Sequence, residues 1–180
     1  MENLELYSVS DQYISYLRKT VPNVYSNKEG QRSHTRKYLG IVFKIENYKY
    51  YIPLSSPKDS DYILQNGKNV IRKSTLTILR IISEGISGED ELKGTVRISN
   101  MIPVPDSELE LYDVEQETDT TYKDLIQKEL IFIRKSKKTI IKNAGLIYKQ
   151  KKMGQCEAGY MNSILDFSVL EHLHDDWEQS

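Results

Sequence analysis

Two runs of residues that favour extended backbone, with only two residues between them, constrain the fold of this chain most. The runs cover residues 38–45 and 48–54, and Glu46 and Asn47 connect them. Both runs are rich in Tyr, Ile and Leu, and a two-residue connection between such runs is typical of a tight antiparallel hairpin. We therefore predict a hairpin whose second strand ends close to the residues that precede the first strand.

The second strand leads into two hydroxyl residues, a proline and a lysine, which are Ser55, Ser56, Pro57 and Lys58. Hydroxyl donors and a positive charge at the rim of a sheet suit a phosphate group, although the same residue types also form ordinary exposed turns. The Ser-x-x-Lys spacing matches penicillin-recognising serine enzymes, but the companion motifs of those enzymes are absent from the sequence. We therefore exclude a serine hydrolase and keep the other two interpretations.

The composition favours one compact domain spanning residues 1–180, because 38% of the residues are hydrophobic and this is the usual domain size. No run approaches the length of a membrane span, and the chain opens with Glu2, Leu4 and Glu5 rather than with an export signal. The single cysteine, Cys156, has no partner for an internal disulfide. We expect a cytoplasmic protein with no membrane partner and an inert thiol.

The formal net charge of -1 hides a strong segregation of charge along the chain. Residues 123–152 contain ten basic and two acidic residues, whereas residues 106–119 contain seven acids and no base. Grouped cations favour a polyanion, because its binding releases condensed counterions. We therefore predict nucleic-acid binding by two groups of residues. The first is Lys135, Lys138, Lys142 and Lys149, and the second is Arg32, Arg36 and Lys37.

The N-terminal part predicts a short strand and a helix. Leu4 and Leu6 alternate with polar residues, and Ser10 or Asp11 can cap the helix that follows. The inner face of this helix consists of Tyr13, Ile14 and Leu17. Residues 20–37 show no periodicity, so we expect a long loop.

The remaining sequence predicts further strands at residues 75–82, 92–98 and 101–104, in a sheet that we expect to be antiparallel. A long helix begins at Thr121, where Asp124 completes a capping box, and continues to residue 152, with or without a break. Its inner face consists of Tyr122, Leu125, Ile126, Leu130 and Ile133. A last helix, capped by Asp166, covers residues 167–174. The predicted fold class is α+β.

Five segments occur in a characteristic order along the chain. They are VSDQYISYLR at residues 9–18, RKYLGIV at 36–42, YIPLSSPK at 51–58, NMIPVP at 100–105 and DFSVLE at 166–171. In order and spacing the segments resemble the endoribonuclease toxins of type III toxin-antitoxin systems, the family that includes ToxN and AbiQ. The resemblance spans nearly the whole chain.

The resemblance implies a compact, strongly twisted antiparallel sheet with flanking helices, similar to the Kid and MazF toxins. It also implies cleavage of A-rich single-stranded RNA, cellular or phage mRNA and not DNA, without a metal or cofactor. The inhibitor in this family is an RNA pseudoknot cut from a tandem-repeat transcript, and toxin and RNA close into a cyclic assembly that serves phage defence by abortive infection.

The resemblance also implies the positions of the active site. These are Tyr13, Ser55, Ser56, Lys58 and a cation that is either Arg36 or Lys37. RNA can be cleaved by its own 2′-hydroxyl, so the enzyme has to align that hydroxyl, move protons and stabilise charge. We expect Ser56 to hold the scissile phosphate, Lys58 and Arg36 to stabilise the developing charge, and Tyr13 to orient the 2′-hydroxyl or stack on a base. The products would carry 2′,3′-cyclic phosphate and 5′-hydroxyl ends.

This sequence departs from some relatives at two of these positions and at Ser60. Some relatives have Thr in place of Ser55, Lys in place of Arg36 and Trp in place of Ser60, so base stacking near Ser60 is open. Ser55, Ser60 and His34 are nevertheless expected to lie against the RNA, together with the basic residues of the loop.

Four alternatives remain open at this stage. His34 can take part in proton transfer, as in a two-histidine ribonuclease. His172 and His174 lie beside acids, but two residues apart on a helix they face different directions, which disfavours a metal site. A non-catalytic RNA-binding module and a protein-interaction domain with paired acidic and basic faces are the other functions that fit the charges.

Overall fold

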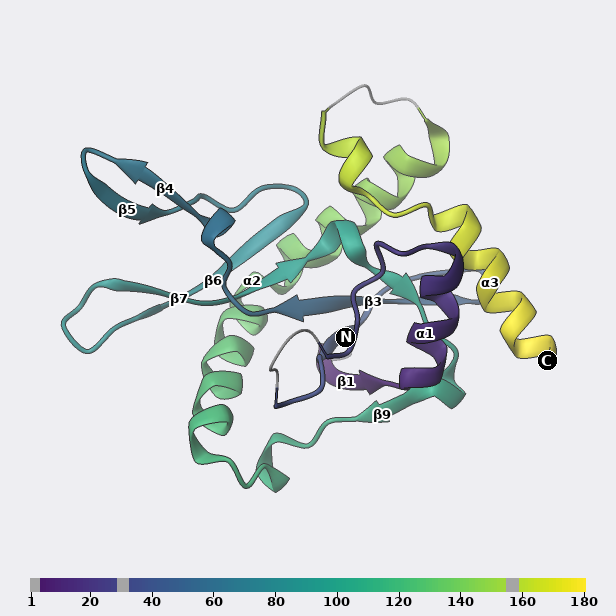
Figure 1. Cartoon of the computed structure of the whole chain (residues 1–180), viewed down its shortest axis with the longest axis horizontal. Helices are drawn as coiled ribbons and strands as arrows, with labels where there is room; N and C mark the ends of the chain where they lie inside the picture. The colour runs from purple at the N-terminus through teal and green to yellow at the C-terminus, as the bar shows by residue number, and fades with distance from the viewer. Residues whose placement is uncertain (1–3, 29–32, 155–158) are drawn as a thin grey trace.

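The computed structural model describes residues 4–28, 33–154 and 159–180 (Figure 1). A seven-stranded antiparallel sheet has the strand order β6-β7-β3-β2-β1-β9, and β8 pairs with β3 beside β7. Its strands are β1 (Glu5–Val9), β2 (Tyr38–Ile45), β3 (Tyr48–Ser55), β6 (Ile78–Glu84), β7 (Asp90–Arg97), β8 (Ile102–Pro103) and β9 (Leu109–Leu111). The other elements are α1 (Asp11–Thr20), α2 (Thr120–Met153), α3 (Phe167–Gln179) and the separate hairpin of β4 (Tyr62–Gln65) and β5 (Lys68–Ile71).

The predicted hairpin is confirmed as β2 and β3, with Ile45 paired opposite Tyr48. Glu46, in the turn, has a left-handed φ of 51°. The backbone N–H of Leu54 donates to the carbonyl of Lys37 at 2.9 Å. The end of β3 therefore lies beside Lys37, at the end of the loop that precedes β2, as predicted for a hairpin.

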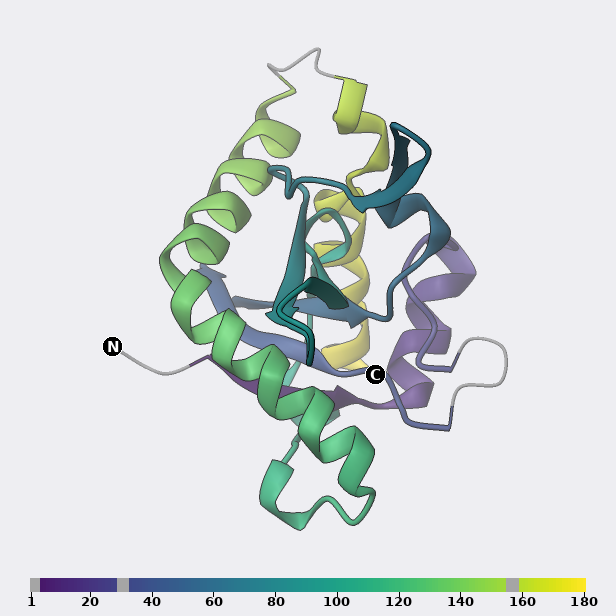
Figure 2. The same cartoon turned by 90° about the vertical axis from the view of Figure 1, so that its left-hand side faces the viewer.

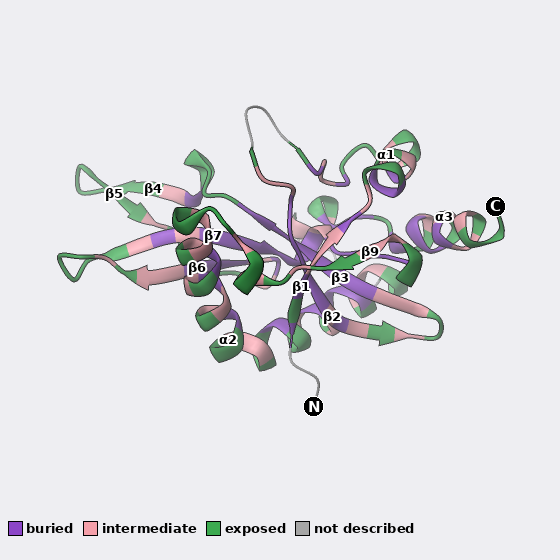
Figure 3. Cartoon of the chain, turned by 90° about the horizontal axis from the view of Figure 1, so that it is seen from below, coloured by how far each residue is buried: buried purple, intermediate pink, exposed green. Residues whose placement is uncertain are grey.

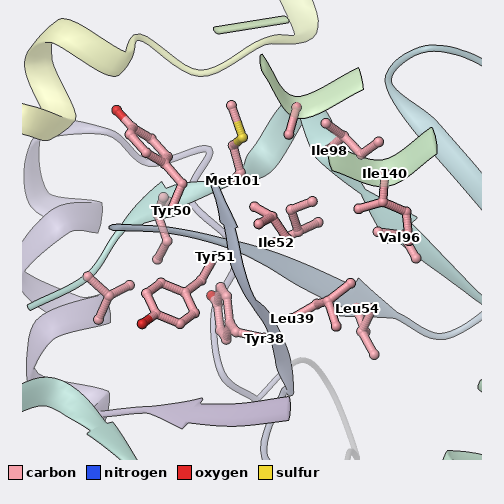
Figure 4. Packing of buried hydrophobic residues seen from close by; sticks show 14 of the residues in the cluster. Tyr38, Leu39, Tyr50, Tyr51, Ile52, Leu54, Val96, Ile98, Met101 and Ile140 are labelled. Atoms are coloured by element: carbon pink, nitrogen blue, oxygen red, sulfur yellow. The ribbon is translucent and has the colours of Figure 1, made fainter. Parts of the chain in front are cut away.

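Strand β3 is at the centre of the hydrophobic core. It pairs with β2 along one edge and with β7 and β8 along the other, so both of its edges are hydrogen-bonded. Tyr50, Tyr51, Ile52 and Leu54 are all buried, and Figure 4 shows them among the side chains of neighbouring elements. Burial of large apolar and aromatic side chains along one strand is the main stabilising contribution here.

The helices cover the sheet on more than one side. Figure 2 shows α2 along one side of the β2–β3 pair and α1 on the other. The α1 helix is capped by Ser10, as predicted, and buries Tyr13, Ile14 and Leu17. On α2, the apolar residues Ile126, Ile133, Ile140, Ala144 and Ile147 are buried at helical spacing.

Helix α3 is fastened to the core by a buried carboxylate. Glu171 accepts hydrogen bonds from the hydroxyls of Tyr50 at 2.8 Å and Tyr148 at 2.7 Å. Lys152 pairs with its other oxygen at 2.6 Å. Because burying a charge without partners is costly, these three contacts explain how a glutamate fits inside the protein.

Several predicted boundaries differ from the structure. The capping box with Asp124 is wrong: Asp119 caps α2 by accepting from the backbone N–H groups of Thr121 and Tyr122, and Asp124 pairs with Lys128 instead. The helix continues without a break to Met153, and α3 extends beyond the predicted residue 174. The α+β class with an antiparallel sheet is confirmed, whereas the likeness to Kid and MazF stays a prediction.

Two elements were not predicted. The β4–β5 hairpin turns at Asn66 and Gly67, both with positive φ, and it projects from the sheet with an exposed tip (Figure 3). Strand β9 forms within the acidic segment and pairs with β1. Among the described residues, none of the helices has the length and apolar content that crossing a membrane requires.

Replacing Leu39 by Ala should lower the free energy of unfolding by about 2–5 kcal/mol, because Leu39 is fully buried in β2 and its loss leaves a cavity. Leu64→Ala is the matched control, since Leu64 is 70% exposed on the projecting hairpin and its loss should change the value by less than about 0.5 kcal/mol. Urea unfolding followed by circular dichroism measures both. Equal effects would contradict the core described above.

Candidate active site

The end of β3 presents Ser56 and Lys58 at the surface. Ser55 is buried and lies opposite Thr95 of β7, so it is held within the sheet. The residues from Ser56 to Lys58 are exposed, and Pro57 restricts the backbone between them. The structure therefore places one hydroxyl and one ammonium group, two residues apart, on a rigid strand end that faces solvent.

Arg36 lies directly beneath this strand end. Its Nη1 donates to the carbonyl of Leu54 at 2.7 Å and its Nε to the carbonyl of Ser26 at 2.8 Å. The guanidinium carbon lies 4.6 Å from the centre of the Tyr25 ring, and Lys58 Nζ lies 5.1 Å from the same centre. Tyr25, which the sequence analysis missed, thus brings both cations together through cation–π contacts.

A buried aspartate fixes the backbone of Lys58. The carboxylate of Asp61, at the end of a 3₁₀ turn (Asp59–Asp61), accepts the backbone N–H of Lys58 at 2.9 Å. It also pairs with Arg80 and Arg97, each at 3.1 Å, and is itself 0% exposed. Arg97 Nε in turn donates to the hydroxyl of Thr95 at 2.8 Å. This network connects the loop that carries Lys58 to two strands of the sheet.

A cavity of about 200 Å³ lies on the other side of the strand end, between β3 and α2. Ser56 is among the residues that line it, together with Lys37, Lys93, Tyr122 and Glu129. Lys37 is largely buried, its Nζ donates to the carbonyl of Thr35, and it lies 4.4 Å from the centre of the Tyr112 ring. Arg36 therefore lies near Lys58, with which it shares the Tyr25 ring, whereas Lys37 lines this cavity.

His34 fastens the basic loop to the start of α2. Its Nε2 lies 3.1 Å from Asp119 Oδ2, and its ring stacks on Tyr122 with 3.7 Å between ring centres and 3° between planes. Hydrogen bonds from the backbone N–H of Tyr122 and from His34 lower the pKa of the Asp119 carboxyl. His34 thus has a structural contact with α2 and also lines the cavity beside Ser56.

Tyr13, which the sequence predicted to be catalytic, is buried in the core, and its catalytic role stays a prediction. Its side chain is 0% exposed, and its hydroxyl donates to the carbonyl of Pro103 at 2.9 Å. The ring packs edge-on against Trp177. Burial raises the pKa of Tyr13 well above its usual range, so the phenol stays neutral. In this conformation Tyr13 supports the core, and its side chain is not exposed at the surface.

The remaining predicted RNA-binding residues either do not line the cavity beside Ser56 or lie outside the described residues. Ser60 is exposed in the 3₁₀ turn, and Arg32 lies outside the residues that the structure describes. Four of the basic residues of α2 occur at spacings of three, four and seven and are all exposed, which places them on one face of the helix. They are Lys135, Lys138, Lys142 and Lys149, and we refer to them as the lysine stripe.

The C-terminal helix groups one histidine with two acids. His174, Asp175 and Glu178 can place ligand atoms within 4.8 Å of one another, and His172 is not in this group, which is drawn from the described residues only. Asp175 already accepts a hydrogen bond from the hydroxyl of Tyr48 at 2.7 Å. The absence of a metal site stays a prediction.

The comparison with protein families identifies this chain. A family model described as toxin ToxN of type III toxin-antitoxin systems matches residues 5–175, and the chain belongs to this family. It is 28% identical over 178 residues to an endoribonuclease ToxN of Pectobacterium atrosepticum, covering 97% of this chain and 94% of that protein. It is 29% identical over 168 residues to endoribonuclease AbiQ of Lactococcus lactis subsp. lactis, covering 93% and 86%.

Solved structures share the fold. One comes from work on selective toxin inhibition by a non-coding RNA pseudoknot in bacterial type III systems. Its TM-score is 0.81 at 23% identity, covering 99% of this chain and 100% of that chain. Another, from work on a processed non-coding RNA that regulates a bacterial antiviral system, has a TM-score of 0.77 at 26% identity, covering 96% and 98%.

Replacing Asp61 by Ala should lower the free energy of unfolding by about 3–5 kcal/mol, because two buried guanidinium groups would lose their shared counter-ion. Asp124→Ala removes an exposed pair with Lys128 and should cost less than about 0.5 kcal/mol. Denaturant unfolding of both variants measures the difference. If Asp61→Ala unfolds at the same denaturant concentration as the unmodified protein, the network does not hold Lys58 in place.

Proposed function

We propose that this chain is an endoribonuclease toxin of a type III toxin-antitoxin system, acting in the cytoplasm on A-rich single-stranded RNA. The observation that carries the proposal is the strand end, where Ser56 and Lys58 are exposed above the buried Arg36. Membership of the ToxN family and the endoribonuclease activity of its relatives support the same function.

The chemistry follows from what this site offers. The 2′-hydroxyl of the substrate loses its proton to solvent water and attacks the adjacent phosphorus, the bond to the 5′-oxygen breaks, and the products carry a 2′,3′-cyclic phosphate and a 5′-hydroxyl. Ser56 donates to a non-bridging oxygen of the phosphate, and the ammonium of Lys58 stabilises the charge that develops there and protonates the leaving oxygen. The reaction needs no metal, because side chains supply both the charge and the proton.

Arg36 acts from beneath the surface. Its guanidinium is fully buried, so it does not touch the RNA in this conformation. It holds the carbonyl of Leu54 and contributes positive charge close to Lys58 through the Tyr25 ring that they share. A charge in a region of low dielectric acts more strongly than one in water, so Arg36 still favours an anion at the strand end.

The lysine stripe is proposed to bind the RNA antitoxin. Its four lysines span about 20 Å along α2, and none of them forms an ion pair with another residue in the described part of the chain. The structure of a similar protein was solved in work on toxin inhibition by a non-coding RNA pseudoknot. We propose that a repeat-derived pseudoknot likewise binds this toxin and closes a cyclic assembly with it. Toxin released from it during phage infection would cleave mRNA and abort the infection.

Incubating the purified protein with A-rich single-stranded RNA in EDTA tests the proposed activity. Endonucleolytic fragments ending in cyclic phosphate are expected, and mass spectrometry of the fragments identifies the ends. Bound but intact RNA would instead support the non-catalytic RNA-binding module. Cleavage that requires an added divalent metal would contradict the mechanism while leaving the nuclease activity standing.

Ser56→Ala and Lys58→Met should each lower kcat for RNA cleavage by about 10²–10³-fold, because each removes a group that stabilises the transition state. Ser107→Ala and Lys44→Met are the matched controls, since both residues are exposed elsewhere on the surface and should leave kcat unchanged. Single-turnover cleavage of a fluorescent oligonucleotide gives the rates. Full activity in both site variants would overturn the assignment.

Replacing the four residues of the lysine stripe by Gln should weaken pseudoknot binding and reduce its salt dependence. Each lost phosphate contact lowers the slope of log K against log salt by about 0.7–0.9. A control variant with the same change in charge replaces the exposed lysines Lys19, Lys44, Lys68 and Lys73. Filter binding at several salt concentrations measures the slopes, and equal slopes for the two variants would exclude the stripe as the binding surface.

A further inference from the structure

The cavity beside Ser56 contains a glutamate where α2 would otherwise present an apolar residue to the core. Glu129 lies between the buried Ile126 and Ile133 on the inner face of the helix and is only 5% exposed. A buried carboxylate is costly and contributes little to stability compared with an apolar side chain of similar size. Its position in the wall of a cavity that also contains Ser56 points to a role in binding.

Helix α2 packs closely against β7, and this brings the carboxylate of Glu129 near the end of β3. A Cβ atom built on Gly94 of β7 would lie 2.5 Å from Glu129 Oε1 and 3.0 Å from the carbonyl oxygen of Ser55. Only glycine leaves room for the carboxylate at this point. Glu129 is therefore seated against the same backbone that carries Ser56.

Other residues of the lining are aromatic and cationic. Tyr122 and His34 form a stacked pair with nearly parallel rings, and both line the cavity. Lys93, which also lines it, is partly exposed and pairs with Glu91 at the surface. A volume of about 200 Å³ is below that of pockets for drug-sized ligands and suits one planar heterocycle.

We propose that this cavity is a subsite for a single unstacked nucleobase next to the scissile phosphate, and that it selects bases with an exocyclic amino group. The carboxylate of Glu129 accepts a hydrogen bond from that amino group, the Tyr122–His34 pair provides an aromatic surface for the base, and Lys93 faces the flanking phosphate. Uracil, which has a carbonyl at the corresponding place, meets the carboxylate with oxygen against oxygen.

This inference rests on the proposed nuclease function for its substrate but depends on different residues. Ser56 and Lys58 act on the phosphate, whereas Glu129 and Tyr122 act on the base. Loss of the subsite should therefore change which RNA is cleaved more than how fast the preferred bond breaks.

The test deletes one amino group from the substrate. Oligonucleotides carry a single ribose, so that cleavage occurs at one phosphate, with adenine or purine on either side of it. The unmodified protein should cleave the adenine substrate at least about tenfold more efficiently in kcat/KM at one of the two positions, because purine lacks the amino group that donates to the carboxylate. No discrimination at either position would overturn the proposal.

Glu129→Gln keeps the size of the side chain and should reduce the preference for adenine over uracil about tenfold or more, since an amide can also donate to a carbonyl. Gly94→Ala, which displaces the carboxylate, should do the same. The exposed Glu84→Gln is the matched control and should keep the preference. An unchanged preference in Glu129→Gln would contradict the proposal, whatever its effect on the overall rate.

Binding separates this inference from the proposed function. Fully 2′-O-methylated oligonucleotides cannot be cleaved, so fluorescence anisotropy with them measures the subsite in a protein with or without nuclease activity. The unmodified protein should bind the adenine-containing form more tightly than the purine-containing form. If RNA is cleaved but the adenine and purine forms do not differ in binding or in kcat/KM, the subsite is contradicted and the nuclease function is not. If the two forms differ in binding but no RNA is cleaved, the nuclease function is contradicted and the subsite is not.

Discussion

The hydrogen bonding of β3 along both edges is the constraint on which the rest of the structure depends. At its end, Leu54 bonds to the backbone of Lys37 on one side, and Ser55 pairs with Thr95 on the other. A strand held in this way cannot shift in register without exposing its buried face. The residues that follow it therefore leave the sheet at a fixed point, with the charge of Arg36 below them.

The strongest patterns in the sequence predicted the hairpin, the capped helix α1 and the position of Ser56, because alternation and capping are local properties. Asn66 and Gly67 also carried a local hairpin signal that was overlooked. The roles of Tyr25 and Asp61 depend on contacts between residues distant in sequence, and no local pattern encodes them. For Glu129 the sequence contained one signal, which is an acidic residue at a position of the helix where an apolar residue is expected.

The outcome for Tyr13 shows how a helical face and an active-site position can coincide in a sequence. Its spacing with Ile14 and Leu17 predicted burial, and the structure places all three in the core. A tyrosine at such a position satisfies its hydroxyl internally, here on the carbonyl of Pro103. Packing thus explains the burial of Tyr13, whereas its catalytic role stays a prediction.

Strand β9 closes one edge of the sheet with only three residues, and the acidic Glu110 lies at its centre. An open edge can recruit the edge of another copy and start aggregation, but two copies meeting here would bring like charges together over very few backbone groups. Self-association through this edge is therefore disfavoured. The short acidic edge thus helps newly made protein to remain dispersed as separate molecules.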